Sequence, residues 1–171
     1  MNNQLKIAFG WCFIALMTLI ASPGYATLQI KMRLADGSGK YIGTVRADDT
    51  IYGVLLTPKL HDLKPGVHAF HVHEVPLCDD HAKAAGGHLD LTDIGEHRGP
   101  YAGNSHSGDL PMLIVNSKGK ATTPILAPRL KLSQIGGRAL VIQAGEDNFS
   151  DTPVEDGGGG LRIACGDIPY H

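Results

Sequence analysis

Apolar and polar residues alternate along much of the chain after residue 26. Leu28, Ile30, Met32 and Leu34 are apolar, and polar side chains stand between them. Alternation with a period of two residues is typical of a strand that buries one face. Similar apolar runs predict further strands at 51–57, 67–74, 110–115, 121–125, 139–144 and 161–165.

Turn-forming residues separate these runs, as in Ala35-Asp36-Gly37 and Lys64-Pro65-Gly66. The sequence contains neither a long helical period nor an internal repeat. Short strands joined by Gly and Pro turns predict an all-β sandwich or barrel. Two long stretches, 77–108 and 145–160, lack the strand pattern, and loops of that length are usually functional or disordered.

Residues 1–26 differ from the rest of the chain. Lys6 precedes an apolar run over 7–21, and Gly24-Tyr25-Ala26 places small residues at both positions that a signal peptidase reads. This pattern predicts a secretory signal peptide, with residues 27–171 as the single exported domain. The apolar run is short for a membrane span, and a retained N-terminal anchor is the alternative.

The charges exclude one class of function, and the cysteines indicate a disulfide. Fifteen Lys and Arg residues against 17 Asp and Glu residues are too few to suggest binding to nucleic acid. Two cysteines, Cys78 and Cys165, follow the signal segment. In an oxidising compartment an even number favours a disulfide, and a free buried pair is the alternative.

The histidines carry the strongest chemical signal, and all nine follow residue 26. His71 and His73 lie two residues apart in a predicted strand, so both imidazoles point to the same face. Phe70 and Val72 alternate with them and can face the core. His68 has the opposite parity and is predicted to be a structural, hydrogen-bonded histidine.

The loop that follows contains His88, His97 and His106 at intervals of nine residues, and Asp109 comes three residues later. Three imidazoles and one carboxylate suit a tetrahedral zinc site. Loop histidines taken alone are more often solvated, but the two strand histidines just upstream favour a metal site.

Several of these segments together resemble the copper/zinc superoxide dismutases: FHVHE at 70–74, GGH at 86–88, EHRGP at 96–100 and HSGDLP at 106–111. LAPRL at 126–130 and GGGGLRIACG at 157–166 are similar to the bacterial branch of that family. The resemblance implies an eight-stranded Greek-key β-barrel, or flattened sandwich, with two long functional loops.

The resemblance also implies a role for individual residues. Copper would be bound by His71, His73 and His88, and zinc by His88, His97, His106 and Asp109, with His88 bridging the two ions. Arg162 would be the catalytic residue that guides superoxide to copper. Asp147 would orient His71 and His97 from behind, and Cys78 would pair with Cys165.

The fourth copper ligand of the family is a histidine, and the corresponding residue here is Gln143. The residues that follow, Gly145-Glu146-Asp147-Asn148, keep the family register, so the substitution is not a shift of alignment. An amide oxygen is a hard ligand that suits monovalent copper poorly. We therefore predict weakened copper binding, and His81 and His171 are the remaining alternative donors.

The implied function is superoxide dismutation in the periplasm, with Zn²⁺ and Cu²⁺/Cu⁺ as cofactors. Expected partners are the superoxide anion, a copper donor and a second copy of the chain as a homodimer, with no nucleic acid and no membrane once the signal is removed. One alternative is a metal-binding protein with little or no dismutase activity because of Gln143. Another is a disulfide-linked sandwich that binds a partner and holds only a structural metal.

Overall fold

The computed structural model describes residues 26–170, which form nine strands, one short α-helix and two 3₁₀ turns. The strands are β1 (Thr27–Leu34), β2 (Tyr41–Thr50), β3 (Gly53–Leu60), β4 (Gly66–His68), β5 (Phe70–His73), β6 (Leu113–Val115), β7 (Ile125–Ala127), β8 (Ala139–Gln143) and β9 (Arg162–Asp167). The helical elements are η1 (Lys83–Ala85), α1 (Leu132–Ile135) and η2 (Glu155–Gly158). The predicted signal segment (except Ala26) and His171 lie outside the described residues.

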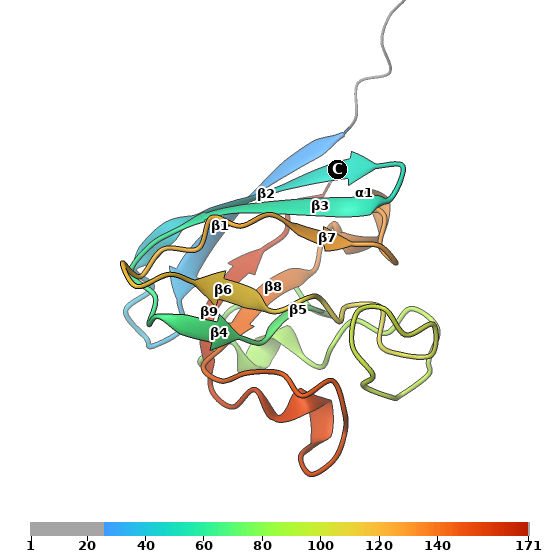
Figure 1. The fold of residues 1–171 in the computed structure, drawn as a ribbon. Helices are drawn as coiled ribbons and strands as arrows, with labels where there is room; N and C mark the ends of the chain where they lie inside the picture. The colour runs from blue at the N-terminus through green and yellow to red at the C-terminus, as the bar shows by residue number, and fades with distance from the viewer. Residues whose placement is uncertain (1–25, 171) are drawn as a thin grey trace, which may run out of the picture.

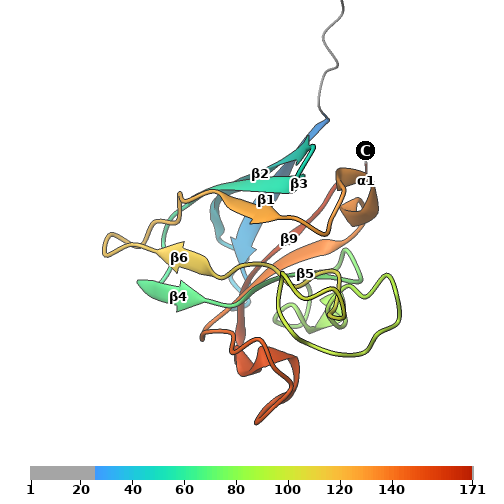
Figure 2. The same ribbon diagram turned by 45° about the vertical axis from the view of Figure 1, so that its right-hand side comes forward.

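Seven strands form one antiparallel sheet in the order β5-β8-β9-β1-β2-β3-β7, while β4 and β6 form a separate pair (Figure 1). Figure 2 shows how the large sheet curls over the β4–β6 pair. This arrangement confirms the predicted all-β class. Within residues 26–170, no helix combines the length and the apolar character that a membrane crossing needs.

The predicted strand at 67–74 is divided between the two sheets. β4 pairs with β6 and β5 pairs with β8. The switch occurs at Ala69, whose N–H donates to the Gly145 carbonyl (2.7 Å) and whose carbonyl accepts from the Gln143 N–H (2.9 Å). The resemblance implied eight strands. The structure has nine, because the single segment predicted at 67–74 forms both β4 and β5. The Greek-key connectivity stays a prediction.

Two strand assignments made from sequence are corrected by the structure. The ten-residue strand β2 was not predicted, because Gly43 and the 48–49 Asp pair weaken its apolar alternation. The strand predicted at 121–125 is wrong: Ala121 makes only an isolated bridge to Leu60, and regular pairing begins at Ile125. Pro124 lies between them and has no N–H to donate to a neighbouring strand.

The two faces of the β5–β8 pair have different surroundings. Phe70, Val72, Leu140 and Ile142 lie in the main hydrophobic core. On the opposite face, a smaller apolar cluster forms between the strands and the loop after β5; its members include Ala82, Ala85, Ala139, Val141 and Cys165. The predicted disulfide between Cys78 and Cys165 is present, with Cα atoms 5.6 Å apart. It fastens the long loop to β9.

Candidate metal centre

Strand β5 lies at an edge of the large sheet, and the loop after it pairs with that edge. The Val72 N–H donates to the Gly108 carbonyl (2.9 Å), and the Val72 carbonyl accepts from the Leu89 N–H (2.8 Å). A Cβ atom at Gly108 would lie 2.2 Å from the Val72 carbonyl oxygen, so this approach requires glycine. The pairing brings Asp109 opposite His71 and His88 opposite His73.

Of the four loop residues predicted to bind zinc, the three histidines converge on one oxygen atom of the fourth residue, Asp109. We call His88, His97, His106 and Asp109 the loop group. The Nδ1 atoms of His97, His88 and His106 lie 2.9, 3.2 and 3.8 Å from Asp109 Oδ1. All four residues are buried. Three imidazole nitrogens facing a carboxylate oxygen match the donor set of a tetrahedral zinc site.

A second set of donors lies on the same face of the sheet. His71 and His73 are fully buried, and their cross-strand partners are Val141 and Ala139. Gln143 comes two residues after Val141, just past an irregularity in the pairing of β8 with β9, and its side chain is also buried. We call His71, His73 and Gln143 the strand group.

His88 stands between the two groups. Its ring stacks on His71 with centroids 3.8 Å apart and meets His73 edge-on at 5.0 Å. Its Nδ1 atom faces Asp109 in the loop group. His88 therefore belongs to two overlapping sets of possible metal donors, one with His71, His97 and Asp109 and the other with His106 and Asp156.

Asp147 connects the two groups from behind. Its Oδ2 accepts from His71 Nε2 (2.8 Å) and its Oδ1 from His97 Nε2 (2.8 Å). The side chains of all three residues are completely buried. These contacts leave His71 Nδ1 and His97 Nδ1 turned toward the cluster.

The surroundings shift the pKa values of His71 and His73 in the opposite direction to that of His97. Burial, with the neighbouring His88, lowers the pKa of His71 to about 4 and that of His73 to about 2, so both imidazoles are neutral near pH 7. Burial alone would also lower the pKa of His97, but Asp109 and Asp147 raise it to about 10. Burial would raise the pKa of Asp109, yet hydrogen bonds from His88, His97 and Ser105 hold it well below its usual range.

Buried atoms that have no hydrogen-bond partner provide a test for metal binding. Five such side-chain atoms occur in residues 26–170, and four of them belong to this cluster: His71 Nδ1, His73 Nε2, Gln143 Oε1 and His106 Nδ1. A buried polar atom without a partner is costly, and the cost is removed when the atom coordinates an ion. The donor atoms present fit two metal ions, one beside each group.

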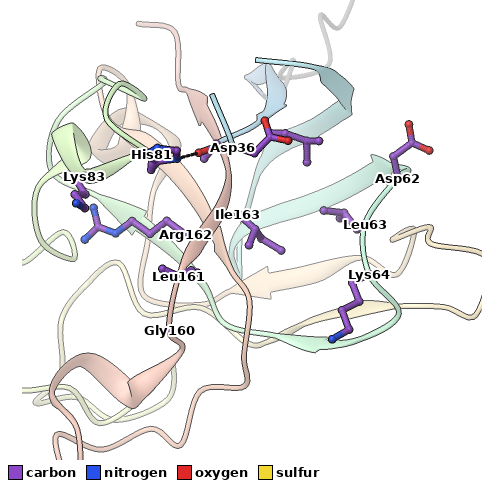
Figure 3. Close-up of a pocket in the computed structure, with 12 residues that line it drawn as sticks. Asp36, Asp62, Leu63, Lys64, His81, Lys83, Gly160, Leu161, Arg162 and Ile163 are labelled. Atoms are coloured by element: carbon purple, nitrogen blue, oxygen red, sulfur yellow. Dashed lines mark hydrogen bonds between the residues drawn. The ribbon is translucent and has the colours of Figure 1, made fainter. Parts of the chain in front are cut away.

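Arg162 lies next to the strand group. Its guanidinium donates to the carbonyls of Ala82 (2.7 Å) and Gly86 (2.9 Å), and the Gly86 carbonyl also accepts from His73 Nδ1 (3.0 Å). Burial lowers the pKa of Arg162 from its usual value. Arg162 lines a cleft of about 720 Å³ together with His81 and Lys83, and its side chain extends toward the segment that carries them (Figure 3).

Other predicted histidines are outside the cluster. His68 is buried, and its ring nitrogens face the carbonyls of Gln143 (2.9 Å) and Lys64 (2.8 Å), which confirms its structural role. His81 Nδ1 is 2.7 Å from the Ala35 carbonyl oxygen. That contact directs His81 into the cleft of Figure 3, away from its predicted alternative use as a metal donor.

Sequence reasoning missed several residues that support the loop group. Ser105 Oγ hydrogen bonds to Asp109 Oδ2, and Asp151 Oδ2 accepts from the His97 N–H (2.9 Å). Arg129 donates to the carbonyls of Ala102, Ser105 and His106. Arg129 lies in the quoted LAPRL motif, whereas nothing in the local sequence distinguishes Ser105 or Asp151 from other loop residues.

The fold and the donor set together define a β-protein with a buried metal centre, and comparison with known proteins identifies its family. The sequence pattern of the copper/zinc superoxide dismutases (SODC) matches residues 41–168. The chain is 50% identical to a superoxide dismutase [Cu-Zn] 1 of Salmonella typhimurium, over 83% of this chain and 86% of that protein. It belongs to the copper/zinc superoxide dismutase family, a family of oxidoreductases.

Two solved structures support the same assignment. A Cu/Zn superoxide dismutase from Brucella abortus aligns with a TM-score of 0.78 and 41% identity, covering 84% of this chain and 99% of that one. The monomeric copper, zinc superoxide dismutase from Salmonella enterica aligns with a TM-score of 0.73 and 48% identity, with the same coverage.

Proposed function

We propose that this protein is an exported superoxide dismutase whose copper site contains an amide in place of one imidazole. The observation that carries the proposal is the sharing of His88 between two donor groups. The loop group would hold zinc. His71, His73 and His88 would hold copper, with Gln143 at the fourth position.

Bound copper would supply the electron transfer, in which two superoxide anions and two protons yield one oxygen molecule and one hydrogen peroxide molecule. The chain's own contribution begins with attraction of the anion. Arg162 carries the positive charge beside the strand group, and its two hydrogen bonds to backbone carbonyls keep the guanidinium in place. A fixed cation at the entrance raises the local concentration of an anionic substrate, as the handling of superoxide by this enzyme class illustrates.

Asp147 and the backbone keep the imidazoles oriented. Asp147 holds His71 and His97, and the Gly86 carbonyl holds His73. Each contact occupies one ring nitrogen and leaves the other directed at the proposed ion. Such outer partners commonly change metal affinity by about 10- to 100-fold.

Gln143 distinguishes this site from one made only of imidazoles. Its Oε1 is buried without a partner and faces Gly159, where a Cβ atom would come within 2.3 Å of that oxygen. Divalent copper accepts an amide oxygen better than monovalent copper does, because oxygen is the harder ligand. The amide therefore weakens retention of the reduced ion.

The cellular setting is part of the same proposal. Residues 1–26 form a signal peptide that directs residues 27–171 to the periplasm, where the disulfide between Cys78 and Cys165 is stable. The relatives with high identity are bacterial proteins. A donor protein loads the copper, and two copies of the chain associate as a homodimer.

Pulse radiolysis tests the proposal directly. The protein loaded with copper and zinc and its Gln143→His variant are compared for superoxide decay, with the metal content of both assayed in parallel. We expect rapid, copper-dependent decay with the natural sequence and tighter copper retention in the variant. Slow superoxide decay with the natural sequence, together with fast decay in the Gln143→His variant, would overturn the dismutase assignment.

That second outcome defines the alternative function, which Gln143 itself favours: a dismutase-like metal-binding protein with little or no turnover. In that case the loop group would bind zinc normally, and the strand group would store copper or remain without it. Zinc-only occupancy after purification with copper present distinguishes this candidate.

A further inference from the structure

The zinc side of the cluster includes a second carboxylate that the sequence motifs do not identify. Asp156 Oδ1 lies 3.8 Å from His106 Nδ1 and 3.9 Å from His88 Nδ1. Asp109 Oδ1 lies equally far from His106 Nδ1, at 3.8 Å. His88, His106 and Asp156 form a set of possible metal donors of their own.

His106 provides independent evidence that a ligand belongs at this position. The residue is nine-tenths buried, and its Nδ1 has no hydrogen-bond partner among the described residues. With the four donors of the loop group, a further donor makes the zinc ion five-coordinate. Two donors at bond lengths of 2.0–2.1 Å and angles of 90–120° are about 2.8–3.6 Å apart, and Asp156 exceeds that range by a few tenths of an ångström.

The backbone holds Asp156 over the cluster. Asp151 links the two segments, because its Oδ1 accepts from the Asp156 N–H (3.2 Å) and its Oδ2 from the His97 N–H (2.9 Å). The next residue, Gly157, is buried so closely that a Cβ atom there would lie 2.0 Å from Asp147 Oδ1 and 2.7 Å from His97 Nε2. The turn that carries Asp156 is thus packed directly against the proposed ligands.

We propose that Asp156 is an additional carboxylate donor of the zinc centre, an inference that rests on the zinc site proposed above. One carboxylate leaves a bound zinc ion with a net charge of +1, and a second makes the centre neutral. The Asp156 side chain is 38% exposed, whereas that of His106 is 11% exposed. Asp156 therefore closes the outer side of the ion toward solvent and ties the 145–160 loop to the metal.

The test compares three forms of the protein: the natural sequence, Asp156→Asn and Glu155→Gln. Asn tolerates the positive φ of 57° that Asp156 adopts, so the first variant preserves the turn. Glu155 is exposed and adjacent, so the second variant removes the same charge without touching the cluster. Zinc affinity is measured by competition with a chelator, and Co²⁺ substituted at the zinc site reports the coordination number by its visible absorption.

We expect Asp156→Asn to weaken zinc binding at least tenfold and to change the Co²⁺ absorption, while Glu155→Gln matches the natural sequence in both. Equal affinities and spectra in all three forms would overturn the role of Asp156. An equal loss of zinc affinity in both variants would show a general effect of charge, which also overturns the proposed role of Asp156. Failure of the natural sequence to bind zinc stoichiometrically would instead remove the zinc centre on which the inference rests.

Discussion

The loop group and the strand group lie side by side, yet they are held in place by different means. In the loop group, Asp109 accepts hydrogen bonds from His88, His97 and Ser105, so charged contacts organise the donors. In the strand group, the donor atoms of His71, His73 and Gln143 have no hydrogen-bond partner. The backbone ladder between β5 and β8 carries His71 and His73, whose other ring nitrogens contact Asp147 and the Gly86 carbonyl. Gln143 is held by its N–H bond to the Ala69 carbonyl.

This difference explains where a ligand can be exchanged. A backbone hydrogen bond is independent of the side chain, so Gln143 can replace an imidazole while its N–H still donates to the Ala69 carbonyl. A replacement of Asp109 would instead leave His88 and His97 without their common acceptor. The strand group can therefore vary in chemistry at constant geometry, and the loop group cannot.

The largest expected effect comes from removing the covalent link between the loop and the sheet. The disulfide joins residues separated by 87 positions, and its loss in a Cys78→Ala/Cys165→Ala variant should destabilise the protein by about 4–5 kcal/mol in the chain-entropy model. Urea unfolding of the metal-free protein measures the loss. Arg162 should lose its fixed position as well, because Ala82 and Gly86 lie in the tethered loop. A change below about 1 kcal/mol would show that the loop is held mainly by its other contacts.

The pH dependence of the metal-free protein should reveal the charged organisation of the loop group. The pKa of His97 is raised to about 10. The stability that the charged imidazole contributes to the folded state is therefore complete below the ordinary histidine pKa of 6.5 and is lost as the pH rises through 10. We expect a loss on the order of a few kcal/mol between pH 7 and pH 10. The zinc-loaded protein is the control, because zinc on His97 Nδ1 takes the place of the proton that titrates, while the Nε2–H to Asp147 remains. Equal alkaline losses in both forms would contradict the prediction.

Asp147 tests whether the groups are coupled. Asp147→Ala removes the acceptor for His71 and His97 together, so the affinities for copper and for zinc should both fall by about 10- to 100-fold. Glu146→Ala is the matched control, since Glu146 is the exposed acidic neighbour of Asp147. Calorimetric titration with each metal gives the affinities. A fall for only one metal would separate the two sites.

The smallest effect should be confined to the loop group. Ser105→Ala removes the hydrogen bond to Asp109 and the acceptor of the Arg98 N–H, and should cost about 1–2 kcal/mol, with weaker zinc binding and unchanged copper binding. Ser107→Ala is the control, because Ser107 accepts only from the Leu91 N–H near the surface. Thermal unfolding of the zinc-loaded proteins measures the difference. Equal changes in melting temperature in the two variants would show that Ser105 has no specific role in the loop group.

Much of this organisation is already present in local sequence patterns. The alternation from Leu28 to Leu34 predicts β1, and the two-residue spacing of His71 and His73 predicts their common face, because strand side chains alternate whatever the partner strand is. The regular spacing of the loop histidines and Asp109 indicates zinc, because the donor types alone narrow the choice of metal.

The remaining features depend on contacts between distant segments. β2 has a weak pattern of its own and is a strand because β1 and β3 pair with its whole length. Asp156 and Ser105 resemble ordinary loop residues until the turns that carry them pack against His106 and Asp109. The types of donor and their placement on strand or loop are thus determined by the sequence itself. The tertiary structure decides which of these donors meet around one ion. Their meeting depends on how the long loops close, and a local sequence pattern contains no information about loop closure.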